Sequence, residues 1–118
     1  MIPTLGSASC SESERRRPGR YEVRGPADFG TRHWYQRRSR ILNLGLDGCL
    51  IEPRSSTGHS PGDSMEIRFE VNRINFAARA VVRSVYSDGL VGVELVEMGE
   101  PSRTRLLILI DELHAGDD

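Results

Sequence analysis

The sequence contains no lysine, little cysteine and few aromatic residues, and it has no long apolar run. Its 118 residues include 16 basic side chains, all of them arginine, two cysteines and one tryptophan. The longest apolar stretch, Leu106–Ile110, is far shorter than the roughly 20 residues that cross a bilayer. The opening residues also lack the basic start and apolar middle of a signal peptide. We therefore expect a cytoplasmic protein without membrane insertion.

Side chains that could support catalysis or bind a metal are scarce and scattered. Cys10 and Cys49 show neither a pairing pattern nor metal-ligand spacing, so free thiols are expected. His33, His59 and His114 have no partner at ligand spacing, and we interpret them as surface residues. Serine-hydrolase, zinc-protease and phosphate-loop motifs are missing as well. We expect no enzyme activity, no metal and no cofactor.

The formal net charge of −1 conceals an uneven distribution. Residues 1–60 contain ten arginines and six acidic residues, whereas residues 61–118 contain six arginines and eleven acidic residues. Genomic codon bias is the simpler explanation for arginine in place of lysine. The basic excess of the front half nevertheless indicates where an anion could bind.

Alternation of apolar and polar residues predicts several short strands. The clearest is residues 65–71, where Met, Ile, Phe and Val alternate with charged residues, as in a half-buried strand. Turns are predicted at Asp47-Gly48, Asn72–Asn75 and Ser87–Gly89 because these residues tolerate positive φ, and Pro53–Gly62 is predicted as an exposed connection. The other candidate strands are residues 21–23 (interrupted at Gly25-Pro26), 34–44, 49–51, 76–86 and 91–95.

The end of the sequence has helical spacing. Pro101 fits a first helical turn, and Leu106, Leu109, Ile110 and Leu113 recur at intervals of three and four residues, which predicts an amphipathic helix over Pro101–His114. Arg103 and Arg105 fall on its solvated side. Six short strands and one helix predict an all-β fold, a six-stranded antiparallel β-barrel with one C-terminal α-helix.

A cluster of arginines precedes the first strand. Residues 1–14 are rich in serine and lack periodicity, so we expect a disordered N-terminal tail. The segment Arg15–Arg20 reads RRRPGR and is predicted to be a charged loop, because proline and glycine oppose regular structure. Guanidiniums bind phosphates and the O6 and N7 edge of guanine. A nucleotide clamp and a solvated basic linker are both compatible with this loop.

A second motif follows at the predicted hairpin. Asn43–Gly48 reads NLGLDG, and together with Arg16, Arg17 and Arg20 it resembles the paired signature of the PilZ family, RxxxR followed by [D/N]xSxxG. The resemblance covers about Arg15 to Leu113, because the later hairpin and helix also look similar to that family. It implies the same barrel-and-helix fold that the residue pattern predicts.

The resemblance also implies a ligand, cyclic di-GMP, often bound as an intercalated dimer. Carried over, Arg16 and Arg20 would anchor it with help from Arg17, while Asn43 and Gly48 would shape the floor. The serine of the family pattern is Gly45 here, so one hydroxyl donor is missing.

We expect one domain over residues 15–114, with an acidic tail at 115–118. The leading hypothesis is a cyclic di-GMP receptor or adaptor in bacterial second-messenger signalling that acts on a partner protein in trans. The alternative is a PilZ-like interaction module that binds no nucleotide, which Gly45 favours. A small RNA-binding barrel is disfavoured by the 6% aromatic content and the net charge of −1, since nucleic-acid domains usually carry a basic excess. Trp34 is interpreted as a core residue or as a further wall of the site.

Overall fold

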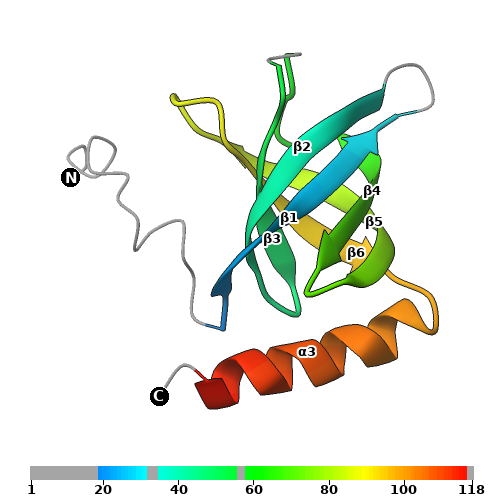
Figure 1. Ribbon diagram of the computed structural model, residues 1–118. Coiled ribbons are helices and arrows are strands. Elements are labelled where there is room, and N and C mark those ends of the chain that lie inside the picture. Colours follow the sequence, from blue (N-terminus) through cyan, green and yellow to red (C-terminus); the bar gives the residue numbers. More distant parts are fainter. Residues whose placement is uncertain (1–18, 32–34, 56–57, 117–118) are drawn as a thin grey trace, which may run out of the picture.

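The computed structural model describes residues 19–31, 35–55 and 58–116. It confirms the expected fold class, a closed antiparallel barrel of six strands followed by one helix (Figure 1). In chain order the elements are β1 (Tyr21–Gly30), β2 (Tyr35–Leu44), β3 (Gly48–Glu52), β4 (Ser64–Val71), β5 (Ile74–Val85), β6 (Val91–Glu97) and α3 (Ser102–Gly116).

The barrel closes because the first strand pairs on both of its edges. The strand order is β1-β2-β3-β6-β5-β4, and the pairing of Ala27 with Phe69 and of Phe29 with Ile67 joins β1 to β4. Closure leaves no unpaired sheet edge. α3 lies across the lower end of the barrel in Figure 1, where Leu106 and Leu109 are buried and belong to the core.

The core follows the period-two pattern of the sequence. Met65, Ile67, Phe69 and Val71 are all buried, while the residues between them face outward or are half-buried. Phe69 stacks on Phe76 across the β4–β5 hairpin, with ring centroids 5.0 Å apart. Alternation therefore predicted the inward side of β4 correctly.

Some boundaries differ from the expected ones. β1 continues through Gly25 and Pro26 to Gly30 instead of stopping there, with register shifts against β2 on both sides of this dipeptide. The turn after β4 is narrower than expected, because only Asn72 and Arg73 adopt positive φ, at 54° and 67°.

The turn between β2 and β3 and the end of the helix also lie elsewhere. Gly48 is the first residue of β3, and residues 45–47 form the turn. α3 runs to Gly116, so the helix includes two residues that were assigned to the acidic tail.

Two buried polar residues of β2 hold the connection that follows β3. The Gln36 side chain donates from Nε2 to the carbonyl of Ser55 at 2.8 Å and accepts from the Ser55 N–H at 3.2 Å. The Ser39 hydroxyl accepts from the N–H of Arg54 at 3.0 Å. These bonds satisfy polar groups that would otherwise be costly to bury, and they fix the loop to the barrel wall.

Candidate functional site

Arg20 begins the candidate site, immediately before β1. Gly19 has a φ of 82°, a left-handed conformation that glycine adopts without strain, and the next side chain lies over the β2–β3 turn. Arg20 has only 8% of its side chain exposed, and its Nε is 3.5 Å from Oδ1 of Asp47. Among the described residues this Nε has no hydrogen-bond partner. The buried Nε faces the Asp47 carboxylate, so a ligand would have to contact the rest of the guanidinium or displace this ion pair.

The glycines of the turn make room for this guanidinium. A Cβ added at Gly48 would collide with the Val93 carbonyl and with the Arg20 guanidinium. A Cβ added at Gly45 would lie 2.8 Å from the Gly19 carbonyl oxygen and 2.9 Å from Cγ of Arg20. Both positions therefore need glycine in this arrangement for steric reasons, because neither residue has a positive φ.

Asn43 supplies a second polar group without a partner. It lies on β2 opposite Leu50 of β3, and it is buried with 6% exposure. Its Oδ1 accepts no hydrogen bond from the described residues. An orphaned buried carbonyl is costly in the free protein, and a ligand donor would relieve that cost.

A surface pocket of about 360 Å³ opens beside Arg20 on the outer wall of the barrel. Its floor includes Leu50 and Gly92, which pair across β3 and β6. A Cβ built at Gly92 would meet Cε2 of Tyr86 at 3.8 Å, so the missing side chain leaves a flat area beside an aromatic ring. The remaining lining residues are Asp47, Arg83, Ser84, Val93 and Glu94.

Three of these lining residues are already in ion pairs, Arg83 with Glu94 and Asp47 with Arg20. Nε of Arg83 lies 2.6 Å from Oε1 of Glu94. Leu50, Tyr86 and Gly92 were not expected at the site, since the outward side of β3, β5 and β6 becomes one surface only when the barrel closes. Arg16 and Arg17, which were expected to contribute, lie outside the described residues, as does Trp34, which was interpreted as a core residue or as a further wall of the site.

Comparisons with solved structures place this barrel in a known fold. A PilZ domain with c-di-GMP, from YcgR of Escherichia coli, matches with a TM-score of 0.61 and 15% identity over 87% of this chain and 94% of that one. The chain has the PilZ fold. The PilZ domain of CeSA from a cellulose-synthesizing bacterium matches with a TM-score of 0.62 and 11% identity over 80% and 97% of the two chains.

A third solved structure is the inhibitor of motility MotI/DgrA of Bacillus subtilis, with a TM-score of 0.71 and 15% identity over 86% of this chain. The match spans 52% of that longer chain. No protein-family model matches the sequence, and no curated protein matches it either. Identities this low establish the shared fold alone.

The core of the PilZ-fold barrel comes close to the site at Cys49. Burial raises the pKa of this thiol to about 12, while the neighbouring Arg20 guanidinium acts in the opposite direction. The thiol therefore stays protonated at neutral pH and acts as an apolar core residue. It is free, as the sequence predicts for Cys49.

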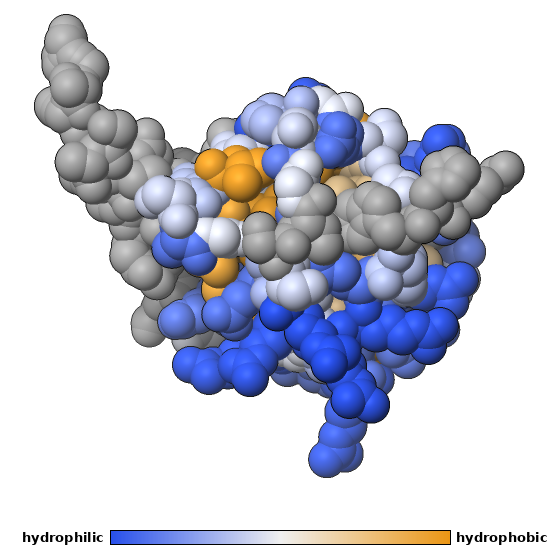
Figure 2. All heavy atoms as spheres, turned by 90° about the horizontal axis from the view of Figure 1, so that it is seen from above, coloured by the Kyte–Doolittle hydropathy of each residue, from blue (hydrophilic) through white to orange (hydrophobic). Residues whose placement is uncertain are grey.

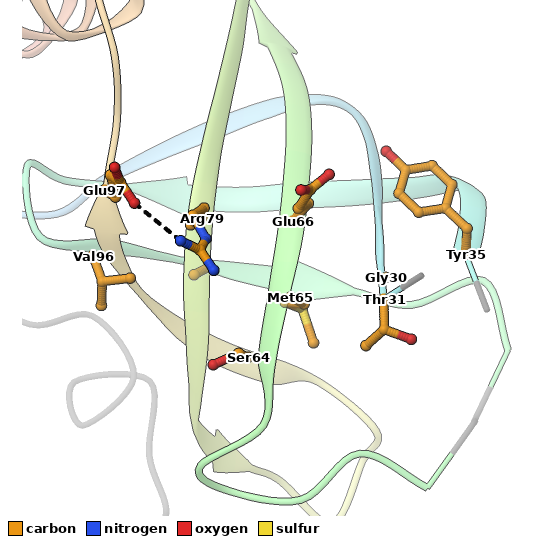
Figure 3. A pocket seen from close by; sticks show the side chains of 10 residues that line it. Gly30, Thr31, Tyr35, Ser64, Met65, Glu66, Arg79, Val96 and Glu97 are labelled. Carbon is orange, nitrogen blue, oxygen red and sulfur yellow. Dashed lines mark hydrogen bonds and ion pairs between the residues drawn. The ribbon is translucent and has the colours of Figure 1, made fainter. Parts of the chain in front are cut away.

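A larger hollow of about 680 Å³ lies elsewhere on the barrel, and Figure 3 shows its lining. Its residues include Tyr35, Glu66 and Arg79, and NH1 of Arg79 is held 3.3 Å from Oε1 of Glu97. None of the residues of the paired arginine and hairpin motifs lines it. The Arg20 pocket is therefore the better candidate, because Arg20 of the arginine motif and Asp47 of the hairpin motif both line it.

Metal-binding groups, membrane-spanning helices and the three histidines are the remaining features to be placed. Among the described residues no group of three or more His, Cys, Asp or Glu could hold a metal, and the part of the chain that the structure describes has no helix long and apolar enough to span a membrane. His59, expected on the surface, is half-buried with its ring centroid 5.3 Å from that of Phe29. His114 is exposed, as expected, and its Nδ1 lies 2.8 Å from the Tyr21 hydroxyl. His33 lies outside the described residues.

Proposed function

We propose that this PilZ-fold protein binds cyclic di-GMP at the Arg20 pocket and acts as a receptor or adaptor on a partner protein in trans. The observation that carries the proposal is the position of Arg20, which lines the pocket and lies against Asp47 of the hairpin motif with 8% of its side chain exposed. Arg16 and Arg17 would join it from the arginine motif. The proposal places the protein in the cytoplasm of a bacterium.

The chemistry of the pocket suits a guanine nucleotide. The planar guanidinium of Arg20 can donate to a phosphate or to O6 and N7 of guanine. Asn43 does not line this pocket, but it lies opposite Leu50 of the pocket floor. Its buried Oδ1 could accept from the amino group of guanine after a local rearrangement. The area over Gly92 beside Tyr86 is flat and can receive a purine face, because aromatic rings stack on bases. A pocket of about 360 Å³ holds part of a cyclic dinucleotide, and the arginine motif would cover the rest.

The solved neighbours support the same choice of ligand. The YcgR neighbour is a PilZ domain with c-di-GMP, and the MotI/DgrA neighbour is an inhibitor of motility. Regulation of a partner in trans, without enzyme activity, agrees with a small receptor of this kind. The ligand could bind as a single molecule or as an intercalated dimer, and titration stoichiometry would distinguish the two.

A PilZ-fold interaction module without nucleotide is the second candidate, and one observation favours it. The space above Gly45, where the family pattern has serine, is filled by the Gly19 carbonyl and the Arg20 side chain. Because residues of the chain itself fill this space, the surface there could contact a partner protein without a nucleotide. The two candidates predict opposite results in a single titration.

The first test is calorimetric titration of the full chain with cyclic di-GMP, with cyclic di-AMP and GTP as comparison ligands. A charge-assisted hydrogen bond contributes about 1.5 to 3 kcal/mol, so Arg20→Ala should weaken binding roughly tenfold to a hundredfold. Arg24→Ala is the matched control, because Arg24 is an exposed arginine of β1, the strand that Arg20 immediately precedes. Equal losses of affinity in both variants would indicate nonspecific charge attraction. A wild type that binds no cyclic di-GMP would favour the interaction module.

A second test uses the two buried amides of β2. Asn43→Leu should abolish the acceptor for guanine while stabilising the free protein by about 1 kcal/mol or more, because Oδ1 is unpartnered among the described residues and a buried orphan costs about 1 to 3 kcal/mol. Gln36→Leu is the control and should destabilise the protein, since its amide bonds Ser55. Urea unfolding and titration measure both effects. Unchanged affinity in Asn43→Leu would remove Asn43 from the site.

A further inference from the structure

The side of α3 that faces away from the barrel has an apolar centre. Leu106 and Leu109 are buried against the core, yet Leu107 and Ile108 are 47% and 55% exposed. In Figure 1 the helix lies across one end of the barrel, so its opposite side faces solvent. A helix that is apolar on both sides normally has a packing partner on each. The outer face of α3, defined here as Arg103, Thr104, Leu107, Ile108, Asp111 and Glu112, is exposed throughout.

The charges on this outer face, and on Arg105 beside it, run against the helix dipole. Arg103 and Arg105 lie near the N-terminus of α3, and Asp111 and Glu112 lie toward its C-terminal end. Cations near the N-terminus and anions near the C-terminus of a helix are each unfavourable. None of these four side chains forms an ion pair with another residue in the described ranges. Stability of the isolated helix therefore does not explain their order.

We propose that the outer face of α3 binds the same face of a second copy of this chain, with the two helices antiparallel. Residues four apart form adjacent ridges on a helix, here Arg103-Leu107-Asp111 and Thr104-Ile108-Glu112. A two-fold axis near Leu107 and Ile108 brings the apolar centres together. The same axis sets Arg103 of each protomer against the acidic end of the other. One surface thus serves both copies, as an isologous contact requires.

Charge complementarity selects this occupant over others. A parallel pair would set arginine against arginine and carboxylate against carboxylate, which repel at this spacing. A purely acidic or purely basic partner would meet one half of the face favourably and the other half unfavourably. The antiparallel pair satisfies both halves and opposes the two helix dipoles. Because 15 residues span only about 22 Å, the interface is small and the dimer is weak.

The test is a pair of charge-reversal variants of the full chain. Arg103→Glu with Arg105→Glu makes the outer face wholly acidic, and Asp111→Arg with Glu112→Arg makes it wholly basic. Each change follows the helix dipole, so both variants should fold at least as well as the wild type, which circular dichroism can verify. In sedimentation equilibrium from about 10 μM to 1 mM, a range suited to small interfaces, the wild type should self-associate. Each variant alone should remain monomeric, and an equimolar mixture should form a heterodimer.

The matched control separates local pairing from net charge. Arg37→Glu with Arg40→Glu changes two exposed β2 residues and gives the same net charge as the acidic α3 variant. It should retain wild-type self-association and should not pair with the basic α3 variant. A second variant, Leu107→Ser with Ile108→Ser, keeps every charge and should weaken self-association at least tenfold. A wild type that stays monomeric up to about 1 mM, or a mixture of reversed variants that fails to associate, would overturn the proposal. No step of this test needs a nucleotide, so it is independent of the proposed function.

Discussion

At the scale of single residues, the β2–β3 turn contains two glycines whose substitutions have different consequences. The neighbours of Gly48 include the Val93 backbone carbonyl in the middle of the sheet, which cannot move without breaking strand pairing. The neighbours of Gly45 are the Gly19 carbonyl at the edge of the barrel and the flexible Arg20 side chain. A side chain at position 45 requires both the Arg20 side chain and the Gly19 backbone before β1 to shift, whereas one at position 48 would require the paired strand β6 to shift.

Gly45→Ser tests the position where the chain departs from the PilZ pattern. The serine Cβ would lie 2.8 Å from the Gly19 carbonyl oxygen and 2.9 Å from Cγ of Arg20. The Gly19 backbone and the Arg20 side chain must therefore both shift, and the free protein should lose about 1 to 2 kcal/mol, as in overpacked sites. The displaced guanidinium and the new hydroxyl are both available to a phosphate, so cyclic di-GMP affinity should rise a few-fold, in line with about 0.5 to 1.5 kcal/mol for a neutral donor.

Urea unfolding and calorimetric titration measure the two effects of Gly45→Ser separately. The expected result is lower stability together with tighter binding. Unchanged or higher stability would show that a side chain at position 45 does not clash with its neighbours in solution. Weaker binding in a folded protein would show that the ligand needs Arg20 in its packed position.

The sequence motif predicted which residues lie near the turn but not how they are arranged. Arg20, Gly45 and Gly48 come together because Tyr21 pairs with Leu44, which places Arg20 over the turn. The motif does not reveal that Arg20 is nearly buried. Burial depends on the neighbouring strand β6, whose Val93 lies close to Gly48, and this contact exists only in the closed barrel. The roles assigned to these residues in ligand binding stay predictions.

At the scale of elements, β1 shows why a strand can cross a Gly-Pro dipeptide. Gly and Pro usually interrupt strands, and the sequence therefore predicted only residues 21–23. In the barrel, Gly25 approaches the backbone carbonyl of Glu70, where a Cβ would collide. Register shifts on both sides bend β1 at this point, as bulges do. Gly25, which was predicted to interrupt the strand, is what lets β1 curve into contact with β4.

The hairpins of β4 to β6 and the helix were predictable, because their spacing depends on local alternation and burial of one face.

Gly25→Ala should therefore be strongly destabilising. The added methyl would press on the Glu70 backbone, which belongs to the paired strand β4 and cannot yield locally, so we expect a loss of about 2 to 3 kcal/mol. Gly99→Ala is the control, because no other described atom lies within 4 Å of a Cβ built there, and it should change stability by less than about 0.5 kcal/mol. Thermal and urea unfolding give both values. Equal stabilities would mean that β1 does not pack closely on β4.

At the scale of the whole molecule, the two ends of the barrel are closed differently. α3 covers one end with buried leucines. The opposite end, seen in Figure 2, is mainly hydrophilic with a small apolar area among the polar side chains. On this side the β3–β4 connection is fixed by bonds to Gln36 and Ser39, and His59 packs against Phe29 with ring centroids 5.3 Å apart. Global stability therefore depends on loop contacts at one end and on helix packing at the other.

The His59 contact makes global stability depend on pH. Burial lowers the pKa of this imidazole below its usual 6.5, and Asp63 opposes the shift. Above pH 6.5 the ring is neutral in both the folded and the unfolded chain, so the contact contributes fully. As the pH falls, the unfolded chain binds a proton before the folded one does, and stability is lost between the unfolded and the folded pKa.

The free energy of unfolding should therefore fall more from pH 7 to 5.5 in the wild type than in His59→Phe, which keeps a ring against Phe29. The difference should stay below about 1 kcal/mol, because one pKa unit corresponds to about 1.4 kcal/mol and a half-buried ring is still partly solvated. Both proteins have the same carboxylates, so comparing their urea unfolding at the two pH values removes the contribution of those groups to the pH dependence. An identical pH dependence would mean that His59 does not hold the loop against the barrel in solution.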